Sequence, residues 1–142
     1  MNEYEERKKR IVLRWLQKAE SDIKVARHVF EMDEPPTDAI CFHCQQAIEK
    51  YLKAFLTYHN ARVKKTHDLG ILLEMCLEID KEFESTDTDK IANLTPFAVE
   101  IRYPDEIYSP SIDECKESLK LVLEVKEIVL KKLNINESEI SQ

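Results

Sequence analysis

Two cysteines and a histidine lie close together in the second quarter of the sequence. Cys41 and Cys44 have the C-x2-C spacing of zinc sites and redox pairs, and His43 lies between them. A structural zinc needs four ligands, but the remaining cysteines, Cys76 and Cys115, stand alone. At 100° per residue, Cys41 and Cys44 fall on the apolar face of an expected helix, and His43 points away from it. Free cysteine is among the most buried residue types, so packing is the favoured interpretation, and a redox pair at the helix start stays open.

A second candidate follows residue 100, where an arginine, two tyrosines and two prolines come close together. Arg102 offers a planar guanidinium for phosphate, and Tyr103 and Tyr108 offer rings on which a base can stack. The alternative is a rigid turn in which Arg102 pairs with Glu100 or Asp105. The residues alone leave both interpretations open.

Cationic side chains gather in three further places. Lys50 and Lys53 belong to a polar stripe on the second expected helix. This stripe faces a phosphate, an acidic partner or solvent. The runs at residues 7–10 and 62–65 are typical of solvated helix ends or loops. No histidine has a glutamate three residues before it, and no H-E-x-x-H occurs. Metal catalysis therefore has no support, and we expect no metal and no other cofactor.

The composition indicates the elements that must hold these residues. Among 142 residues there is one glycine, while 43% are apolar and 35% are charged. One glycine leaves no glycine-rich phosphate loop, which excludes Rossmann and P-loop folds and favours helices. The net charge is −7, with 13 basic and 11 acidic residues in 1–70 and 8 and 17 in 71–142. The charge therefore disfavours a uniformly basic nucleic-acid surface but leaves a local basic patch open.

Apolar residues spaced three and four apart predict helices over about residues 3–32, about 38–60, and a short stretch after Asp68. A fourth helix is expected over about 88–102, kinked or delayed by Pro96, with 82–90 before it as a loop. The last helix begins after Ser111 and ends near Leu133. These segments predict an all-α, up-and-down bundle of four to five helices in residues 1–134, with the second helix at its centre and residues 135–142 as a flexible tail.

The sequence also bounds the compartment. The amino terminus is charged and no apolar signal segment follows it. The longest uncharged run, residues 39–48, is about half of what a membrane span needs. Four cysteines without an export signal are typical of a reducing setting, so we expect a cytoplasmic protein that does not contact the membrane.

Several pieces of the chain, in order, resemble the HEPN domain family (higher eukaryotes and prokaryotes nucleotide-binding). They are the Trp-Leu-Gln-Lys-Ala-Glu-Ser-Asp-Ile run with its following Ala-Arg, the Cys-Gln-Gln-Ala-Ile-Glu-Lys-Tyr-Leu-Lys-Ala run, Lys-Thr-His-Asp-Leu and Ile-Arg-Tyr-Pro-Asp, at residues 15–27, 44–54, 65–69 and 101–105. Together they extend over nearly the whole chain. The resemblance implies a helical bundle that usually dimerises, binds a nucleotide or RNA, and often pairs with a small nucleotidyltransferase in a toxin–antitoxin-like system.

Active ribonucleases of this family carry an arginine followed, after four to six residues, by a histidine. The resemblance places Arg102 at the arginine, but the histidine positions hold Ile107, Tyr108 and Ser109. The motif for metal-independent RNA cleavage is therefore incomplete, and whether the protein is an enzyme stays open. Tyr108 could replace the histidine as a hydrogen-bond donor, but a phenol is a poor base at neutral pH. A literal Arg-x4-His from Arg62 to His67 is interpreted as coincidence, with His67 ordering its loop.

The leading hypothesis is a nucleotide- or RNA-binding HEPN protein that pairs with a nucleotidyltransferase. Arg102 would hold phosphate and Asp105 would orient it, while Tyr103 and Tyr108 lie near the base. Lys50 and Lys53 would add positive charge if their stripe borders the same cleft. The alternative is a non-catalytic, dimeric helical module that docks the nucleotidyltransferase.

Overall fold

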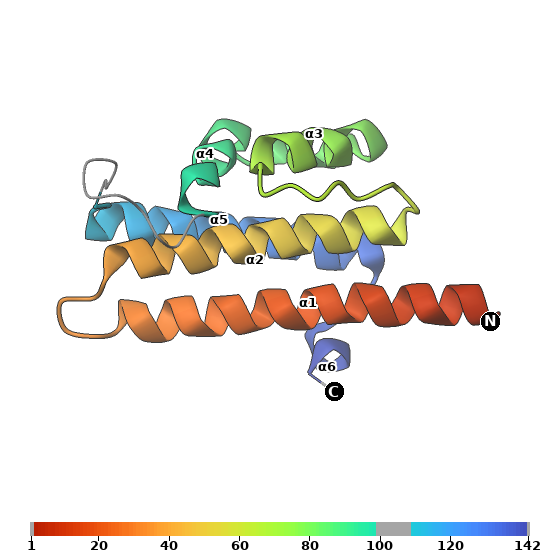
Figure 1. Ribbon diagram of the computed structural model, residues 1–142, viewed down its shortest axis with the longest axis horizontal. Coiled ribbons are helices and arrows are strands. Elements are labelled where there is room, and N and C mark those ends of the chain that lie inside the picture. The colour runs from red at the N-terminus through yellow and green to blue at the C-terminus, as the bar shows by residue number, and fades with distance from the viewer. Residues whose placement is uncertain (1, 99–108, 142) are drawn as a thin grey trace.

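The computed structural model describes residues 2–98 and 109–141, and in these residues it is built from helices (Figure 1). The prediction of an all-α bundle is confirmed. The expected Arg102, Tyr103, Asp105 and Tyr108 lie outside the described residues. The elements are α1 (Glu3–Phe30), α2 (Thr37–Tyr58), α3 (Leu69–Ile79), η1 (Lys81–Ser85), α4 (Thr88–Ala92), η2 (Thr95–Ala98), α5 (Ile112–Leu133) and α6 (Glu137–Ile140).

The long helix α1 forms where the sequence has a continuous apolar stripe. Its buried face includes Val12, Leu16 and Ala19 and continues to Ala26. Asn2 caps the first turn, because its side chain accepts a hydrogen bond from the Glu5 backbone N–H at 2.8 Å. The helix thus presents an apolar face to the rest of the bundle from Val12 to Ala26.

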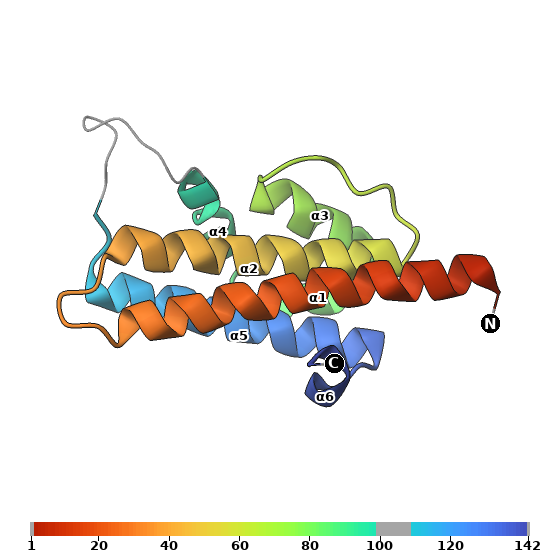
Figure 2. The same ribbon diagram turned by 60° about the horizontal axis from the view of Figure 1, so that its bottom comes forward.

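Helix α2 is the centre of the bundle, as its broad apolar face predicts. It contacts α1, α3, α5 and η2, and α1 and the α3–α4 layer flank it on opposite sides (Figures 1 and 2). Tyr51, Leu52 and Phe55 are fully buried along it. A helix apolar on several sides is stable only when several neighbours cover it.

The three long helices do not all alternate in direction. α1 and α2 are antiparallel neighbours, whereas α5 runs parallel to α2 (Figure 2). Two sulfur contacts fix the parallel pair: Cys115 Sγ lies 3.7 Å from the Thr37 carbonyl, and Cys41 Sγ lies 3.7 Å from Ser118 Oγ. The start of α5 therefore lies beside the start of α2.

The chain between α3 and α5 differs from the prediction in two places: the expected loop contains helical turns, and the expected fourth helix is divided in two. Residues 82–90 are not a loop, because η1 and the start of α4 lie there, capped by Asp80 and Asp87. The single helix expected over 88–102 is also wrong in its described part: α4 ends at Ala92, and η2 begins at Thr95. Pro96 has no N–H to donate to a preceding carbonyl, so an α-helix cannot continue through it unbroken.

Helix α5 begins with a reciprocal cap. The Ser111 side chain accepts from the Glu114 N–H at 3.1 Å, and the Glu114 carboxylate accepts from the Ser111 N–H at 3.4 Å. The helix ends at Asn134, which has a left-handed conformation with φ 54°.

The expected C-terminal tail, residues 135–142, contains the short helix α6. Ile140 is 3% exposed, and its carbonyl accepts a hydrogen bond from Gln17 Nε2 on α1. Lys126 of α5 binds Glu137 at 2.5 Å. These contacts hold α6 against α1 and α5. The boundary of the bundle at residue 134 stays a prediction.

Candidate functional site

The predicted site around Arg102 can be located only by the residues on either side of it, because residues 99–108 lie outside the described part of the chain. On one side, η2 ends at Ala98 and contacts α2. Thr95 Oγ1 in η2 accepts the Leu69 backbone N–H at 3.0 Å, which ties η2 to the start of α3. On the other side, Pro110 is buried before the Ser111 cap. Both flanks are thus fixed to the body of the bundle.

The polar stripe of α2 faces α1 rather than open solvent. Lys50 Nζ lies 2.5 Å from Asp22 Oδ2, and His43 Nδ1 lies 2.9 Å from Asp22 Oδ1. Asp22 is buried in the apolar stripe of α1 at 8% exposure. Because a buried carboxylate needs partners, Lys50 and His43 compensate Asp22 and bind α2 to α1.

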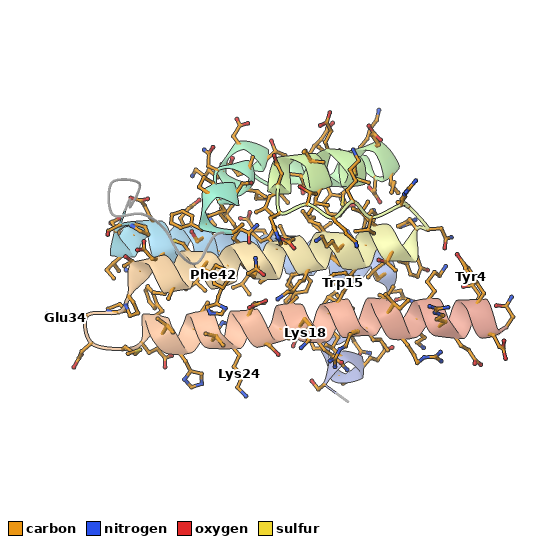
Figure 3. The ribbon with its side chains drawn as sticks, viewed as in Figure 1. Tyr4, Trp15, Lys18, Lys24, Glu34 and Phe42 are labelled. Atoms are coloured by element: carbon orange, nitrogen blue, oxygen red, sulfur yellow. The ribbon has the colours of Figure 1, made fainter. Side chains whose placement is uncertain are left out.

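A second buried carboxylate, Glu49, lies on α2 beside this stripe, one residue before Lys50. Glu49 binds Lys53 at 2.9 Å, and its other oxygen lies 2.8 Å from His67 Nδ1. Lys53 is itself buried, and its ammonium group lies 5.5 Å from the centre of the Trp15 ring, a cation–π distance. Figure 3 labels Trp15 and Phe42 between α1 and α2 on the viewed face.

This arrangement changes the predicted electrostatics of the stripe. Lys50 and Lys53 were expected to supply positive charge, but each is paired with a buried carboxylate. His67 binds Glu49 from the loop after α2, and Gln45 Nε2 donates to the His67 carbonyl at 2.9 Å. His67 therefore orders this loop, as predicted, and the Arg62 to His67 spacing has no catalytic arrangement in the described residues.

A third polar network joins α1, α2, α5 and α6. Glu20 accepts hydrogen bonds from the Tyr51 hydroxyl and from Lys126 Nζ, and Lys126 also binds Glu137. Burial, and then the neighbouring Glu20 carboxylate, raise the pKa of Tyr51 well above its ordinary value. Tyr51 therefore remains a neutral donor at any physiological pH. Throughout the described residues, every buried side-chain nitrogen and oxygen has a partner.

The cysteines pack in the core. Cys41, Cys44, Cys76 and Cys115 are all buried and free, so the burial predicted for Cys41 and Cys44 is confirmed. Burial raises the pKa of each of these thiols, for Cys115 to about 12. A thiol with a raised pKa and little access to solvent is a poor nucleophile at neutral pH. Across residues 2–98 and 109–141, no three histidine, cysteine, aspartate or glutamate side chains are grouped to hold a metal ion.

The buried carboxylates Asp22 and Glu49 are the important residues that sequence reasoning missed. Asp22 carried a signal, because it falls between Ala19, Ile23 and Ala26 in an otherwise apolar stripe. The sequence signal for Glu49 was weaker, because Glu49 lies between the core face and the polar stripe of α2. A charged residue within a buried face requires a partner from a neighbouring element.

Comparisons with known proteins agree with this helical architecture. The family model of the HEPN domain matches residues 12–133, and the chain therefore belongs to the HEPN domain family. A search among curated proteins found no match. Among solved structures, the chain is similar to the crystal structure of an archaeal HEPN homologue, with 21% sequence identity and a TM-score of 0.63. That likeness covers 85% of this chain and 96% of the homologue, and at this identity it shows the fold.

Among the described helices, none is both long enough and apolar enough to cross a membrane.

Proposed function

We propose that this HEPN protein binds a nucleotide or RNA and forms the HEPN half of a toxin–antitoxin-like pair with a small nucleotidyltransferase in the cytoplasm. The observation that carries the proposal is the family match over residues 12–133, because it includes the Arg-Tyr-Pro-Asp sequence at 102–105. In this proposal Arg102 binds phosphate and is oriented by Asp105. Tyr103 and Tyr108 lie near the base.

The described geometry supports a division of roles between these residues and the lysines. Lys50 and Lys53 are engaged by Asp22 and Glu49, so the net positive charge they add is small. The binding energy for a phosphate must therefore come mainly from Arg102. A guanidinium suits this role because it donates two parallel hydrogen bonds to phosphate oxygens.

Filter-binding titrations with a short RNA and with ATP test this role of Arg102. Arg102→Ala should weaken binding by about tenfold or more, because a charge-assisted hydrogen bond contributes about 1.5–3 kcal/mol. Arg14→Ala is the matched control, since Arg14 is an exposed arginine in the middle of α1. Equal affinities of the wild type and Arg102→Ala would reject the proposal.

The second candidate is a non-catalytic, dimeric helical module that docks the nucleotidyltransferase. The absence of histidine at positions 107, 108 and 109 favours it. RNA cleavage by purified protein in EDTA separates the two candidates. Cutting that disappears in Arg102→Ala would reject the module and assign a metal-independent endoribonuclease. If Tyr108 replaces the missing histidine, Tyr108→Phe should abolish that cutting as well.

The proposed homodimer needs its own measurement. Sedimentation equilibrium of the isolated protein should give twice the 16.7 kDa chain mass if the chain pairs with itself. Co-expression with a candidate nucleotidyltransferase tests the docking role. A strictly monomeric protein would contradict the module candidate.

A further inference from the structure

Two basic runs that are far apart in the sequence meet at one end of the bundle. Because α1 and α2 are antiparallel, the first turns of α1 lie beside the last turn of α2, where the following loop begins (Figure 1). The rest of that loop runs back toward α3. The Tyr4 hydroxyl donates to Asn60 Oδ1 at 2.9 Å, which fixes this juxtaposition. The start of the first basic run therefore meets the start of the second: Arg7 lines the same cavity as Ala61 and Val63, the chain neighbours of Arg62.

A cavity of about 380 Å³ opens between these segments. Tyr4, Arg7, Lys8 and Ile11 line it from α1, and Val63 lines it from the loop. No carboxylate is among its lining residues. The volume falls in the range of small-ligand sites, and the lining combines cations, an aromatic ring and apolar groups.

Five of the cations at this end have no ion-pair partner among the described residues. We use the name basic end for Arg7, Arg10, Arg62, Lys64 and Lys65, all of which are exposed. Within residues 2–98 and 109–141, none of the five has an ion pair.

Several lysines elsewhere in the described chain are paired. Lys50, Lys53, Lys126 and Lys132 each bind a carboxylate. Lys8, which lines the cavity, binds Glu5 at 3.2 Å and lies 5.3 Å from the centre of the Tyr58 ring. The first turn of α1 also carries Glu3, Glu5 and Glu6, so the seven cations of residues 7–10 and 62–65 exceed these three carboxylates by four. In a chain with net charge −7, this local excess of positive charge attracts a polyanion.

We propose that the basic end binds the phosphate backbone of single-stranded RNA, as a contact separate from Arg102. Arginine guanidinium groups match phosphate oxygens in pairs, and the Tyr4 ring, at 61% exposure, offers a face on which a base stacks. An acidic protein would pair with the cations but would leave the cavity and the ring unused. The choice of RNA among polyphosphates rests on the proposed function.

The described residues that follow the 99–108 segment and the cavity of the basic end lie at opposite ends of α2. The described flank before α5 lies beside Thr37 at the start of α2, and the cavity is lined by Thr57 near its end. Figure 3 likewise shows Phe42 and Tyr4 toward opposite ends of the α1–α2 pair. At 1.5 Å per residue α2 is about 30 Å long, which corresponds to about nine nucleotides at a 3.4 Å rise. An RNA of about that length therefore spans α2 from end to end, whereas a mononucleotide does not.

The test measures fluorescence anisotropy of a single-stranded RNA of about 12 nucleotides, with ATP binding measured in parallel, over a series of salt concentrations. The double variant Arg7→Glu with Arg62→Glu should weaken RNA binding by about tenfold or more and leave ATP binding unchanged. The slope of log K against log salt should fall by about 1.4, at about 0.7 for each lost phosphate contact on a single strand. The pair Arg7→Gln with Arg62→Gln should lower the slope equally, without introducing repulsive carboxylates.

Lys9→Glu is the matched control, because Lys9 belongs to the same run but lines a different hollow with Glu5 and Glu139. It should leave RNA affinity within about twofold of the wild type. Equal loss in Lys9→Glu would reduce the effect to net charge and overturn the proposal. Polyglutamate that displaces RNA at equal charge concentration would assign the surface to an acidic protein and would also overturn it.

The same titrations separate this proposal from the role of Arg102. If Arg102→Ala loses ATP and RNA while the Arg7 and Arg62 variants bind RNA normally, the basic end is rejected and the proposed function stands. If the Arg7 and Arg62 variants lose RNA while Arg102→Ala binds both ligands normally, the basic end stands and the role of Arg102 is rejected. A wild-type protein that binds neither ligand rejects both.

Discussion

Single buried charges in this protein are compensated by side chains from neighbouring elements. Asp22 of α1 binds Lys50 and His43 of α2, and Glu49 of α2 binds Lys53 of its own helix and His67 of the following loop. Removing one partner of such a pair costs more than the pair contributes, because the other charge stays buried without compensation. These contacts are therefore positions where substitution should damage the fold.

Glu49→Ala should lower the free energy of unfolding by about 3–5 kcal/mol, because it leaves the ammonium group of Lys53 buried without a carboxylate. Urea denaturation followed by circular dichroism measures the change. Glu117→Ala is the matched control, since Glu117 pairs with Lys90 at 3.0 Å on the exposed surface and its loss should cost less than about 1 kcal/mol. Similar losses in both variants would contradict the structural role of Glu49.

Sequence periodicity could predict which face of α2 carries the polar stripe but not what that stripe contacts. Lys50 and Lys53 look like ligand-binding cations because the sequence does not say which residues of α1 or of the following loop lie opposite. The pairing of Lys50 with Asp22 joins residues of two helices, and only the packing of α1 on α2 brings them together. By contrast, the burial of Cys41 and Cys44 followed directly from their place on an apolar face.

At the scale of the elements, the long helices were predictable because their signals are local and repeated. The apolar stripe of α1, the broad face of α2 and the Ser111-x-x-Glu114 cap of α5 each lie within one segment. The predictions failed where short helices depend on caps and on one buried anchor. In η1 the Asp80 cap and the buried Phe83 make a helical turn from a sequence that looks like an acidic loop.

The reciprocal cap of α5 should contribute measurably to stability. Ser111→Ala removes the acceptor for the Glu114 N–H and should cost about 1 kcal/mol of unfolding free energy. Ser21→Ala is the control, because Ser21 is exposed within α1 and donates only to the Gln17 carbonyl one turn earlier. Alanine is a better helix former, so this change should be neutral or stabilising. Thermal denaturation of both variants measures these changes in stability. A loss of stability in Ser21→Ala but not in Ser111→Ala would refute the stabilising role of the Ser111 cap.

Considered as a whole, the molecule combines a paired interior with an unpaired basic end. The family and the order of its motifs were predictable because the matching pieces extend over most of the chain. The meeting of residues 7–10 with residues 62–65 was not, because neither run carries a signal for the other. It follows from the antiparallel packing of α1 against α2, which is a property of the assembled bundle.

The whole protein should have a stability plateau bounded by two sets of groups, and carboxylates set its acid limit. The pKa of Asp80 is lowered by a hydrogen bond from the Glu82 backbone N–H and, to a lesser extent, by Lys132. Lys132 also lowers the pKa of Glu82. Lys126 lowers the pKa of Glu137. A folded pKa below the unfolded one gives stability that is present above the unfolded value and is lost as the pH falls. Stability should therefore decline below about pH 4.5, the ordinary value for Glu82 and Glu137.

The buried thiols set the alkaline limit. Burial raises the pKa of Cys41, Cys44, Cys76 and Cys115 above the ordinary 9.0, so their contribution is complete below pH 9.0 and is lost as the pH rises above it. Each thiol that ionises only in the unfolded chain should lower the free energy of unfolding by about 1.4 kcal/mol per pH unit. Urea denaturation between about pH 8 and 10 measures the slope. Over this range Cys44→Ala should make it shallower by about 0.7 kcal/mol per pH unit on average, because about half of the unfolded thiols are ionised at pH 9.0, whatever its own cost in packing. An identical slope in Cys44→Ala would mean that this thiol ionises in the folded protein as readily as in the unfolded chain.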